Sequence, residues 1–213
     1  MSDFTSNPVV AYYIRGGPFM HPILALFLLG IAVSIWKTIS LRLASINARK
    51  FLLKVKSSLQ EGGVQQAVDV CANTRGPIAA IFHAGLIRTR RGIEQVEKGI
   101  VNAGAIEMAF LERGLLWLAT VISLSPMLGF LGTVWGMVIA FDAIATANDI
   151  SPAIVANGIS QALLTTVFGL IVAITIQTAN NYFVMQIDKI IVDMEESSVD
   201  LVDSLIDMEK SSS

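Results

Sequence analysis

The sequence predicts an all-α integral membrane protein with three transmembrane helices, a helical cytoplasmic domain and long cytoplasmic helix extensions. Of its 213 residues, 54% are hydrophobic and only 15% are charged, and the mean hydropathy is +0.65. A soluble globular domain carries about 25% charged residues, so much of this surface does not face water. Three apolar runs are long enough to cross a bilayer, and no segment shows the alternation typical of a strand.

The first predicted span covers residues 19–41 and follows a predicted periplasmic N-terminus, residues 1–18. The chain begins MSDFTSNPVV, without a basic segment followed by a cleavable apolar stretch. We therefore expect no signal peptide, and the first apolar run is kept as a true span. Proline is tolerated at its start, and Trp36 and Lys37 near its end look like interfacial anchors.

The second and third predicted spans, residues 114–142 and 153–184, form a hairpin around a periplasmic turn at residues 143–152. The uncharged runs exceed the roughly 20 residues that a bilayer needs, so these helices should be tilted or project beyond the hydrocarbon. The turn is predicted from its helix-breaking residues, Asn148, Asp149, Ser151 and Pro152.

Residues 42–113 are predicted to form the cytoplasmic helical domain, broken at Gly62-Gly63 and at residues 75–77. From Ile93 to Pro126 there is no strong breaker, which predicts that the last cytoplasmic helix runs straight into the second span. Most lysine and arginine residues lie in this segment, whereas the turn holds none and the N-terminus only Arg15. The positive-inside rule then predicts a multi-pass protein with the 42–113 segment and the C-terminus in the cytoplasm and the N-terminus outside.

Residues 185–213 are predicted to form an acidic amphipathic cytoplasmic tail that continues the third span. Apolar side chains recur at spacings of three or four, with Ser198 filling one gap: Ile187, Ile190, Met194, Leu201, Leu205 and Met208. The opposite face is acidic. It is either a solvated face or a surface that packs against the basic 42–113 segment or a neighbouring copy.

Small residues recur along both hairpin helices at three- and four-residue spacing. In lipid, such stripes allow helices to pack closely, since no hydrophobic drive holds them together. The glycines that we expect at the helix contact are Gly129, Gly132, Gly136, Gly158 and Gly169.

Polar side chains within the hairpin spans are the candidate ion-pathway residues, and they are Thr133, Gln161, Thr165 and Thr166. Polar groups that face lipid are costly, so these should face a protein interior or a wet cavity. Gln161 and Thr165 are four apart, as are Ala162 and Thr166, which places them on roughly one helical face. The alternative reading is that the threonines hydrogen-bond backbone carbonyls between helices.

Other classes of function find little support in the sequence. A formal net charge of −2 does not point to nucleic acid, and His21, His83 and the single Cys71 form no metal-ligand or disulfide pattern. No nucleophile stands at a suitable spacing from a base, so we expect neither an enzyme nor a cofactor. No carboxylate lies near the middle of any span, so a proton relay would need a titratable group from another chain.

The hairpin resembles that of the ExbB/TolQ/MotA family, over residues 115–141 and 158–174. Its most specific block is Gly-Thr-Val-Trp-Gly at residues 132–136. The layout and the stretch around residues 62–85 also look like the family, closest to its ExbB/TolQ branch. The resemblance implies a homopentamer in the inner membrane around single-span ExbD/TolR-like partners. It also implies a proton-motive-force-driven movement that energises a TonB- or TolA-like protein, with Thr133 and Thr166 lining the pore beside an essential Asp of the partner.

Two positions depart from the family pattern. Gln161 stands where the family usually has Glu, and residues 174–176 are Ile-Thr-Ile without the family's proline. Glutamine keeps the hydrogen-bonding shape but carries no proton. Three hypotheses therefore stay open: a proton-driven motor, a sodium-driven divergent homologue, or a non-conducting scaffold of an envelope complex.

Overall fold

The computed structural model describes residues 8–45, 47–147 and 152–212, and within these ranges all regular structure is helical. The elements in chain order are α1 (Pro8–Arg15), α2 (Met20–Ala44), α3 (Ala48–Ala72), α4 (Pro77–Leu86), the 3-10 turn η1 (Thr89–Arg91), α5 (Ile93–Glu112), α6 (Leu115–Ala147) and α7 (Pro152–Ser212). Three helices are long and apolar enough to cross a membrane. The predicted all-α membrane fold is thereby confirmed.

The chain divides into two compact units, and α2 and α7 each contribute to both. The first unit comprises residues 1–35 and 114–181. The second comprises residues 36–113 and 182–213. The first unit holds the apolar hairpin, and the second holds α3, α4, η1, α5 and the end of α7.

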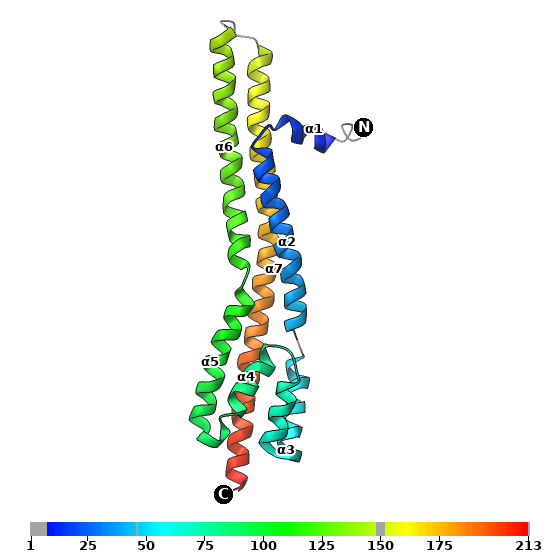
Figure 1. Ribbon diagram of the computed structural model, residues 1–213, viewed down its shortest axis with the longest axis vertical. Coiled ribbons are helices and arrows are strands. Elements are labelled where there is room, and N and C mark those ends of the chain that lie inside the picture. The colour runs from blue at the N-terminus through cyan, green and yellow to red at the C-terminus, as the bar shows by residue number, and fades with distance from the viewer. Residues whose placement is uncertain (1–7, 46, 148–151, 213) are drawn as a thin grey trace. The chain divides into compact units, whose positions relative to one another are not determined.

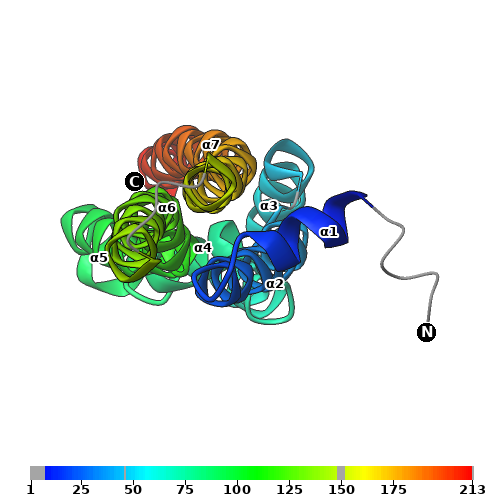
Figure 2. The same ribbon diagram turned by 90° about the horizontal axis from the view of Figure 1, so that it is seen from above.

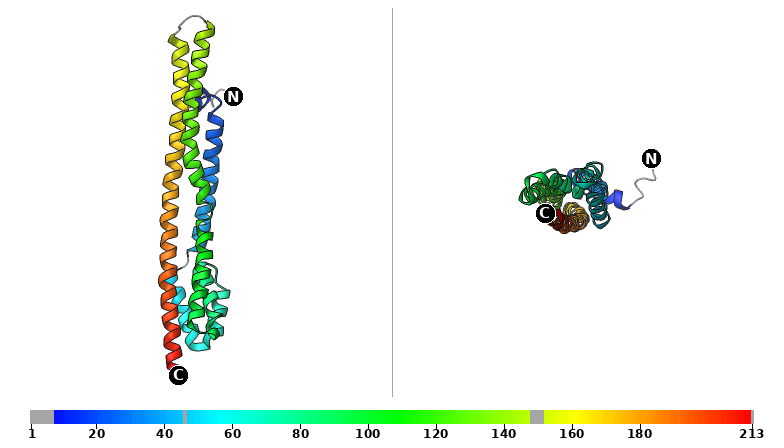
Figure 3. Two further views of the ribbon diagram at one scale, coloured as in Figure 1. Left: turned by 90° about the vertical axis from the view of Figure 1, so that its left-hand side faces the viewer. Right: turned by 90° about the horizontal axis from the view of Figure 1, so that it is seen from below.

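In the first unit, α6 and the first part of α7 run antiparallel and side by side (Figures 1 and 3). α6 extends to Ala147, beyond the predicted end of the second span, while residues 148–151 of the predicted turn lie outside the described residues. Gly30 of α2 lies against Val121 of α6 and Ile176 of α7, so the first span packs on the hairpin. The short helix α1 turns away from the direction of α2 (Figures 1 and 2).

In the second unit, α4 lies between α3 and α5 (Figures 1 and 2). Its core includes a stacked pair of rings, Phe51 and Phe82, with centroids 5.8 Å apart. The predicted breaks are confirmed: Gly63 interrupts α3 with φ +72°, and α4 begins at Pro77, which lacks the N–H that a first-turn residue does not need.

The prediction that the last cytoplasmic helix runs straight into the second span is wrong. α5 ends at Glu112, Arg113 is extended (φ −56°, ψ 129°), and Gly114 has φ +96°. The ammonium of Lys37 donates to the carbonyl of Leu111 and, at 2.9 Å, to that of Arg113. Lys37 is only 1% exposed, so the residue predicted as an interfacial anchor instead satisfies carbonyls at the joint between α5 and α6.

The predicted continuation of the third span into the tail is confirmed, because α7 is one helix of 61 residues. Its buried stripe contains Ile187, Ile190, Met194, Leu201 and Leu205. The gap in the stripe is filled by Ser197, which is 5% exposed, and not by Ser198. The reason is the alternation of steps of three and four along the stripe (187, 190, 194, 197, 201), which Ser197 continues and Ser198 would break. Most acidic side chains of the tail are exposed.

Candidate ion-pathway site on the hairpin

The α6 and α7 backbones approach closely where glycines face the opposite helix. A Cβ added to Gly169 would lie 2.5 Å from the Ser125 carbonyl oxygen and 3.2 Å from the Gly129 Cα. A Cβ on Gly129 would lie 3.0 Å from the Thr165 carbonyl oxygen and the Thr166 Cα. Because these neighbours are backbone atoms, they cannot rotate away from an added side chain.

The remaining glycines of the predicted stripe also lie at the helix contact. A Cβ added to Gly132 would lie 2.5 Å from the Thr165 Oγ1, and one added to Gly136 would lie 3.1 Å from the Ala162 Cβ. A Cβ added to Gly158 would lie 2.4 Å from the Ala140 Cβ. All five glycines named from the sequence are therefore buried against the opposite helix.

Two threonine hydroxyls of α7 share one carbonyl of α6. Thr165 and Thr166 donate to the Gly129 carbonyl at 3.2 and 3.1 Å, and Thr165 also lies 2.7 Å from the Ala162 carbonyl of its own helix. Thr165 is 1% exposed, so its hydroxyl is enclosed in the hairpin. Thr166 is half-buried, so part of its side chain is accessible from outside the hairpin. The interhelical hydrogen bond, the alternative reading from the sequence, is present at both residues.

Thr133 uses its donor within α6. Its hydroxyl donates to the Phe130 carbonyl at 2.6 Å, and the residue is half-buried. A hydroxyl that donates in this way keeps oxygen lone pairs as acceptors. The hydroxyl oxygens of Thr133 and Thr166 can therefore each accept a hydrogen bond while their protons are donated to backbone carbonyls.

Thr133 and Thr166 are rotated around their helices out of the directions in which α6 and α7 contact α2. α2 approaches α6 at Val121, and helical geometry of about 100° per residue places Thr133 about 120° around α6 from that contact. The same geometry places Thr166 about 80° around α7 from Ile176, the other residue that contacts α2. The contact of the Phe19 ring with the Trp135 ring, 6.2 Å between centroids, lies on the α2 side of α6.

Gln161 lies apart from Thr133 and Thr166. Its side chain lies against Gly17, where an added Cβ would be 2.1 Å from Nε2, and Gly17 has φ +74°. The next residue, Ser160, accepts a hydrogen bond from the Arg15 guanidinium at 3.4 Å. The prediction that Gln161 and Thr166 share one face is wrong, because five residues at about 100° each separate them by about 140° around the helix.

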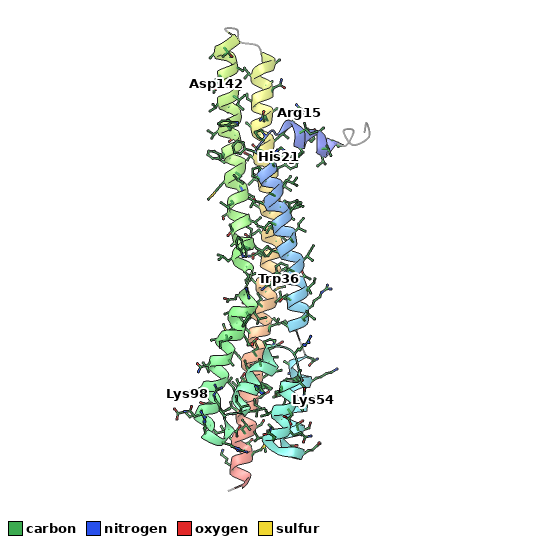
Figure 4. All side chains as sticks on the ribbon, in the orientation of Figure 1. Arg15, His21, Trp36, Lys54, Lys98 and Asp142 are labelled. Atoms are coloured by element: carbon green, nitrogen blue, oxygen red, sulfur yellow. The ribbon has the colours of Figure 1, made fainter. Side chains whose placement is uncertain are left out.

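The sequence did not indicate that the loop before α2 contacts α7, where Gly17 lies against Gln161 and Arg15 donates to Ser160. Arg15 and His21 lie where α1 meets α2 (Figure 4), and the rings of Tyr13 and His21 pack edge to face with centroids 5.7 Å apart. The sequence signal was the pair Gly16-Gly17 with the single basic residue of the N-terminal segment. A glycine pair before a proline indicates a turn, but it does not show which helix the turn contacts.

No Asp, Glu, Lys, Arg or His lies in the sequence from Leu115 to Phe141 or from Ser151 to Ile187. Asp142 lies toward the turn end of α6 (Figure 4). Among the described residues there is also no cluster of three or more His, Cys, Asp or Glu side chains that would hold a metal ion. The site therefore offers hydroxyl and amide groups, and a proton carrier would have to come from outside the described site.

Fold and site together define a multi-pass membrane protein whose closely packed hairpin carries threonine hydroxyl groups along its apolar runs, which hold no carboxylate. The family model of the MotA/TolQ/ExbB proton channel family matches residues 73–196. The chain belongs to this family of transport proteins, as an ExbB/TolQ-type member, and it is a multi-pass inner-membrane protein. The resemblance stated from the sequence is thereby confirmed.

Three relatives illustrate the similarity. A putative biopolymer transport protein ExbB homolog of Methanothermobacter thermautotrophicus is 31% identical over 181 residues, 84% of this chain and 64% of the relative. The Tol-Pal system protein TolQ of Pseudomonas aeruginosa is 38% identical over 117 residues, 50% of this chain and 51% of the relative. The biopolymer transport protein ExbB of Salmonella typhimurium is 38% identical over 101 residues, 47% of this chain and 39% of the relative. The chain thus spans less than two thirds of the length of each.

Proposed function

We propose that this chain is the ExbB/TolQ-like subunit of a motor driven by the proton-motive force. In this proposal a homopentamer surrounds an ExbD/TolR-like single-span partner in the lipid of the inner membrane and energises a TonB- or TolA-like protein. The driven process is outer-membrane transport or envelope maintenance. The observation that supports it best is the pair Thr133 and Thr166, two half-buried threonines on hairpin helices whose runs 115–141 and 151–187 hold no Asp, Glu, Lys, Arg or His.

The threonine geometry suits a partner carboxyl group that alternates between two protonation states. A protonated carboxyl is a donor, and the free lone pairs of Thr133 and Thr166 accept from it. A carboxylate in hydrocarbon is costly, so the partner's Asp crosses apolar surface only when neutral. Exposed apolar side chains flank the threonines on both helices: Phe130, Val134, Leu163 and Val167. A proton picked up on one side would be released where water reaches the hydroxyl groups.

Gln161 and Thr165 take positioning roles in this proposal. Thr165 is enclosed in the hairpin, and Gln161 holds the loop at Gly17. Since Gln161 lies away from the flank of the two pathway threonines, its lack of a titratable proton leaves the proton route intact. The glycine stripe keeps the two backbones close enough for Thr166 to reach the Gly129 carbonyl. We infer the orientation from the basic residues: N-terminus periplasmic, and the 42–113 segment and C-terminus cytoplasmic.

The test is proton uptake by liposomes that hold this chain together with a single-span partner. Thr133→Val and Thr166→Val are combined, which removes both hydroxyl groups and nearly preserves side-chain shape. The matched control combines Thr175→Val and Thr178→Val, two exposed α7 threonines whose hydroxyls donate to carbonyls of their own helix. We expect at least about a tenfold loss of uptake in the first variant, the effect of about 1.4 kcal/mol, and wild-type uptake in the control. Equal uptake by both variants would refute the pathway role.

The runner-up functions use the same preparation. Hydroxyl oxygens also coordinate sodium, so a sodium gradient is imposed in a parallel experiment. Sodium flux that depends on Thr133 and Thr166 without proton flux would identify a sodium-driven homologue. No flux of either ion, with a partner whose span holds no carboxylate, would identify the non-conducting scaffold.

A further inference from the structure

A cavity of about 750 Å³ lies in the second unit, between the ends of α2, α3, α4 and α5. The side chains that matter for its chemistry are Trp36, Leu43, Arg75, Glu107, Phe110 and Arg113. Its volume falls within the range of about 300–1,000 Å³ that small-molecule sites occupy. The hairpin and its threonines take no part in it.

The charge around this cavity favours an anion. Arg75 and Arg113 come from different helix ends, and both side chains are exposed. Among the described residues the only ion pair within 4 Å is Lys98–Glu94, so neither arginine is neutralised by a carboxylate. Guanidinium groups bind phosphate through two parallel hydrogen bonds, which gives geometric specificity as well as charge.

The acidic side chain of the cavity is compatible with that anion. Burial raises the pKa of the Glu107 carboxyl above its usual value. The guanidinium groups of Arg75 and Arg113 outnumber this single carboxyl in the cavity lining, so the lining still favours an anion. Cys71 also lines the cavity, where burial raises the pKa of its thiol to about 12, so the thiol stays protonated at physiological pH.

The cavity also carries an exposed apolar surface that a free anion would not need. Trp36, Leu43 and Phe110 are 50%, 72% and 60% exposed and line the same cavity as the two arginines. Trp36 lies on α2, the first span (Figure 4), and tryptophan favours the membrane–water interface. A basic cavity beside a membrane helix, bordered by apolar side chains, fits a lipid that has an anionic headgroup and acyl chains.

We propose that this cavity binds the headgroup of an anionic phospholipid, with Arg75 and Arg113 on the phosphate and Trp36, Leu43 and Phe110 against the acyl chains. The lipid would come from the leaflet on the side of the 42–113 segment, which is cytoplasmic in the proposed orientation. The binding requires neither ion flux nor a partner protein, so its failure and that of the proposed motor function are distinguishable.

The experiment compares lipids on the delipidated protein in detergent. Phosphatidylglycerol, phosphatidylcholine with the same acyl chains, and inorganic phosphate are each titrated while thermal unfolding and bound lipid, by native mass spectrometry, are measured. We expect phosphatidylglycerol alone to raise the unfolding temperature and to stay bound. An equal shift with phosphatidylcholine would show unspecific solvation, and an equal shift with inorganic phosphate would show a free-anion site; either result overturns the lipid assignment.

Three variants locate the site. Arg75→Gln with Arg113→Gln should weaken phosphatidylglycerol binding by at least about tenfold, since charge-assisted hydrogen bonds are lost. The matched control, Arg90→Gln with Arg91→Gln, removes the same charge from exposed residues of η1 that do not line the cavity and should bind as wild type. Ala80→Phe narrows the cavity without changing charge and should also lose binding, which decides the matter if the double arginine variant fails to fold. The proposal would be overturned if Ala80→Phe bound the lipid as wild type does and the double arginine variant either also bound as wild type or failed to fold.

Discussion

Replacing Gly169 by alanine should destabilise the hairpin although alanine is the better helix former. The new Cβ would lie 2.5 Å from the Ser125 carbonyl oxygen, and this neighbour is backbone, so α6 and α7 must separate to make room. Overpacking of this kind costs about 1–3 kcal/mol. Separation also lengthens the 3.1 Å hydrogen bond from Thr166 to the Gly129 carbonyl, which contributes about 0.5–1.5 kcal/mol. The higher helix propensity of alanine offsets about 0.5–1 kcal/mol of this, which leaves a net destabilisation of roughly 0.5–4 kcal/mol.

The matched control for Gly169→Ala is Gly104→Ala on α5. Gly104 is helical, and an added Cβ meets nothing within 4 Å, so only the propensity gain of about 0.5–1 kcal/mol applies. Thermal unfolding of both purified variants is followed in detergent by tryptophan fluorescence. Gly169→Ala should unfold at a lower temperature than wild type, and Gly104→Ala at the same or a higher one. If Gly169→Ala unfolds at or above the temperature of Gly104→Ala, the reasoning from backbone contact fails.

Three further predictions concern residues outside the hairpin contact. Lys37→Met leaves the Leu111 carbonyl without its donor, which should cost about 1–3 kcal/mol in thermal unfolding, and wild-type stability would show that the joint does not need the ammonium. Burial raises the pKa of the Glu107 carboxyl, so the folded state binds this proton more tightly than the unfolded state does. The carboxyl therefore lowers the stability of the fold as the pH rises from its unfolded-state pKa through its folded-state pKa. Glu107→Gln should unfold at a higher temperature than wild type at neutral pH, and this difference should disappear in acid. Cys71, with a thiol pKa of about 12, should react with iodoacetamide at pH 8 far more slowly in the folded than in the denatured protein, and equal rates would contradict its burial.

The three long apolar helices could be predicted from the sequence because length and hydropathy identify a helix that is able to cross a bilayer. The tail could be predicted because one apolar stripe persists over many turns, and only the choice between Ser197 and Ser198 went wrong. Gly114 was missed as a break because a lone glycine between a charged residue and an apolar run does not by itself end a helix. Its positive φ is needed where the Lys37 ammonium holds the nearby carbonyls, a tertiary contact that no local pattern records.

The candidate site could be predicted in its composition but not in the contacts that its side chains make. Periodicity placed Gln161 near Thr165, yet it could not show that the loop at Gly17 covers that side of α7. Nor could it distinguish the enclosed hydroxyl of Thr165 from the half-buried one of Thr166, since the two are neighbours in sequence and differ only in what α6 places beside them.

The joint at Gly114 and the uninterrupted α7 give the hairpin two mechanically different connections to the rest of the chain. A continuous helix is stiff, so we infer that a tilt or rotation of the hairpin reaches the acidic tail through α7, whereas the α5–α6 joint absorbs the same movement. Val184→Gly with Met185→Gly, both exposed on α7, should soften that connection and reduce ion uptake, and undiminished uptake would contradict the idea. In the proposed motor, α7 would transmit movement of the hairpin as a rigid rod, and the chain would bend at Gly114.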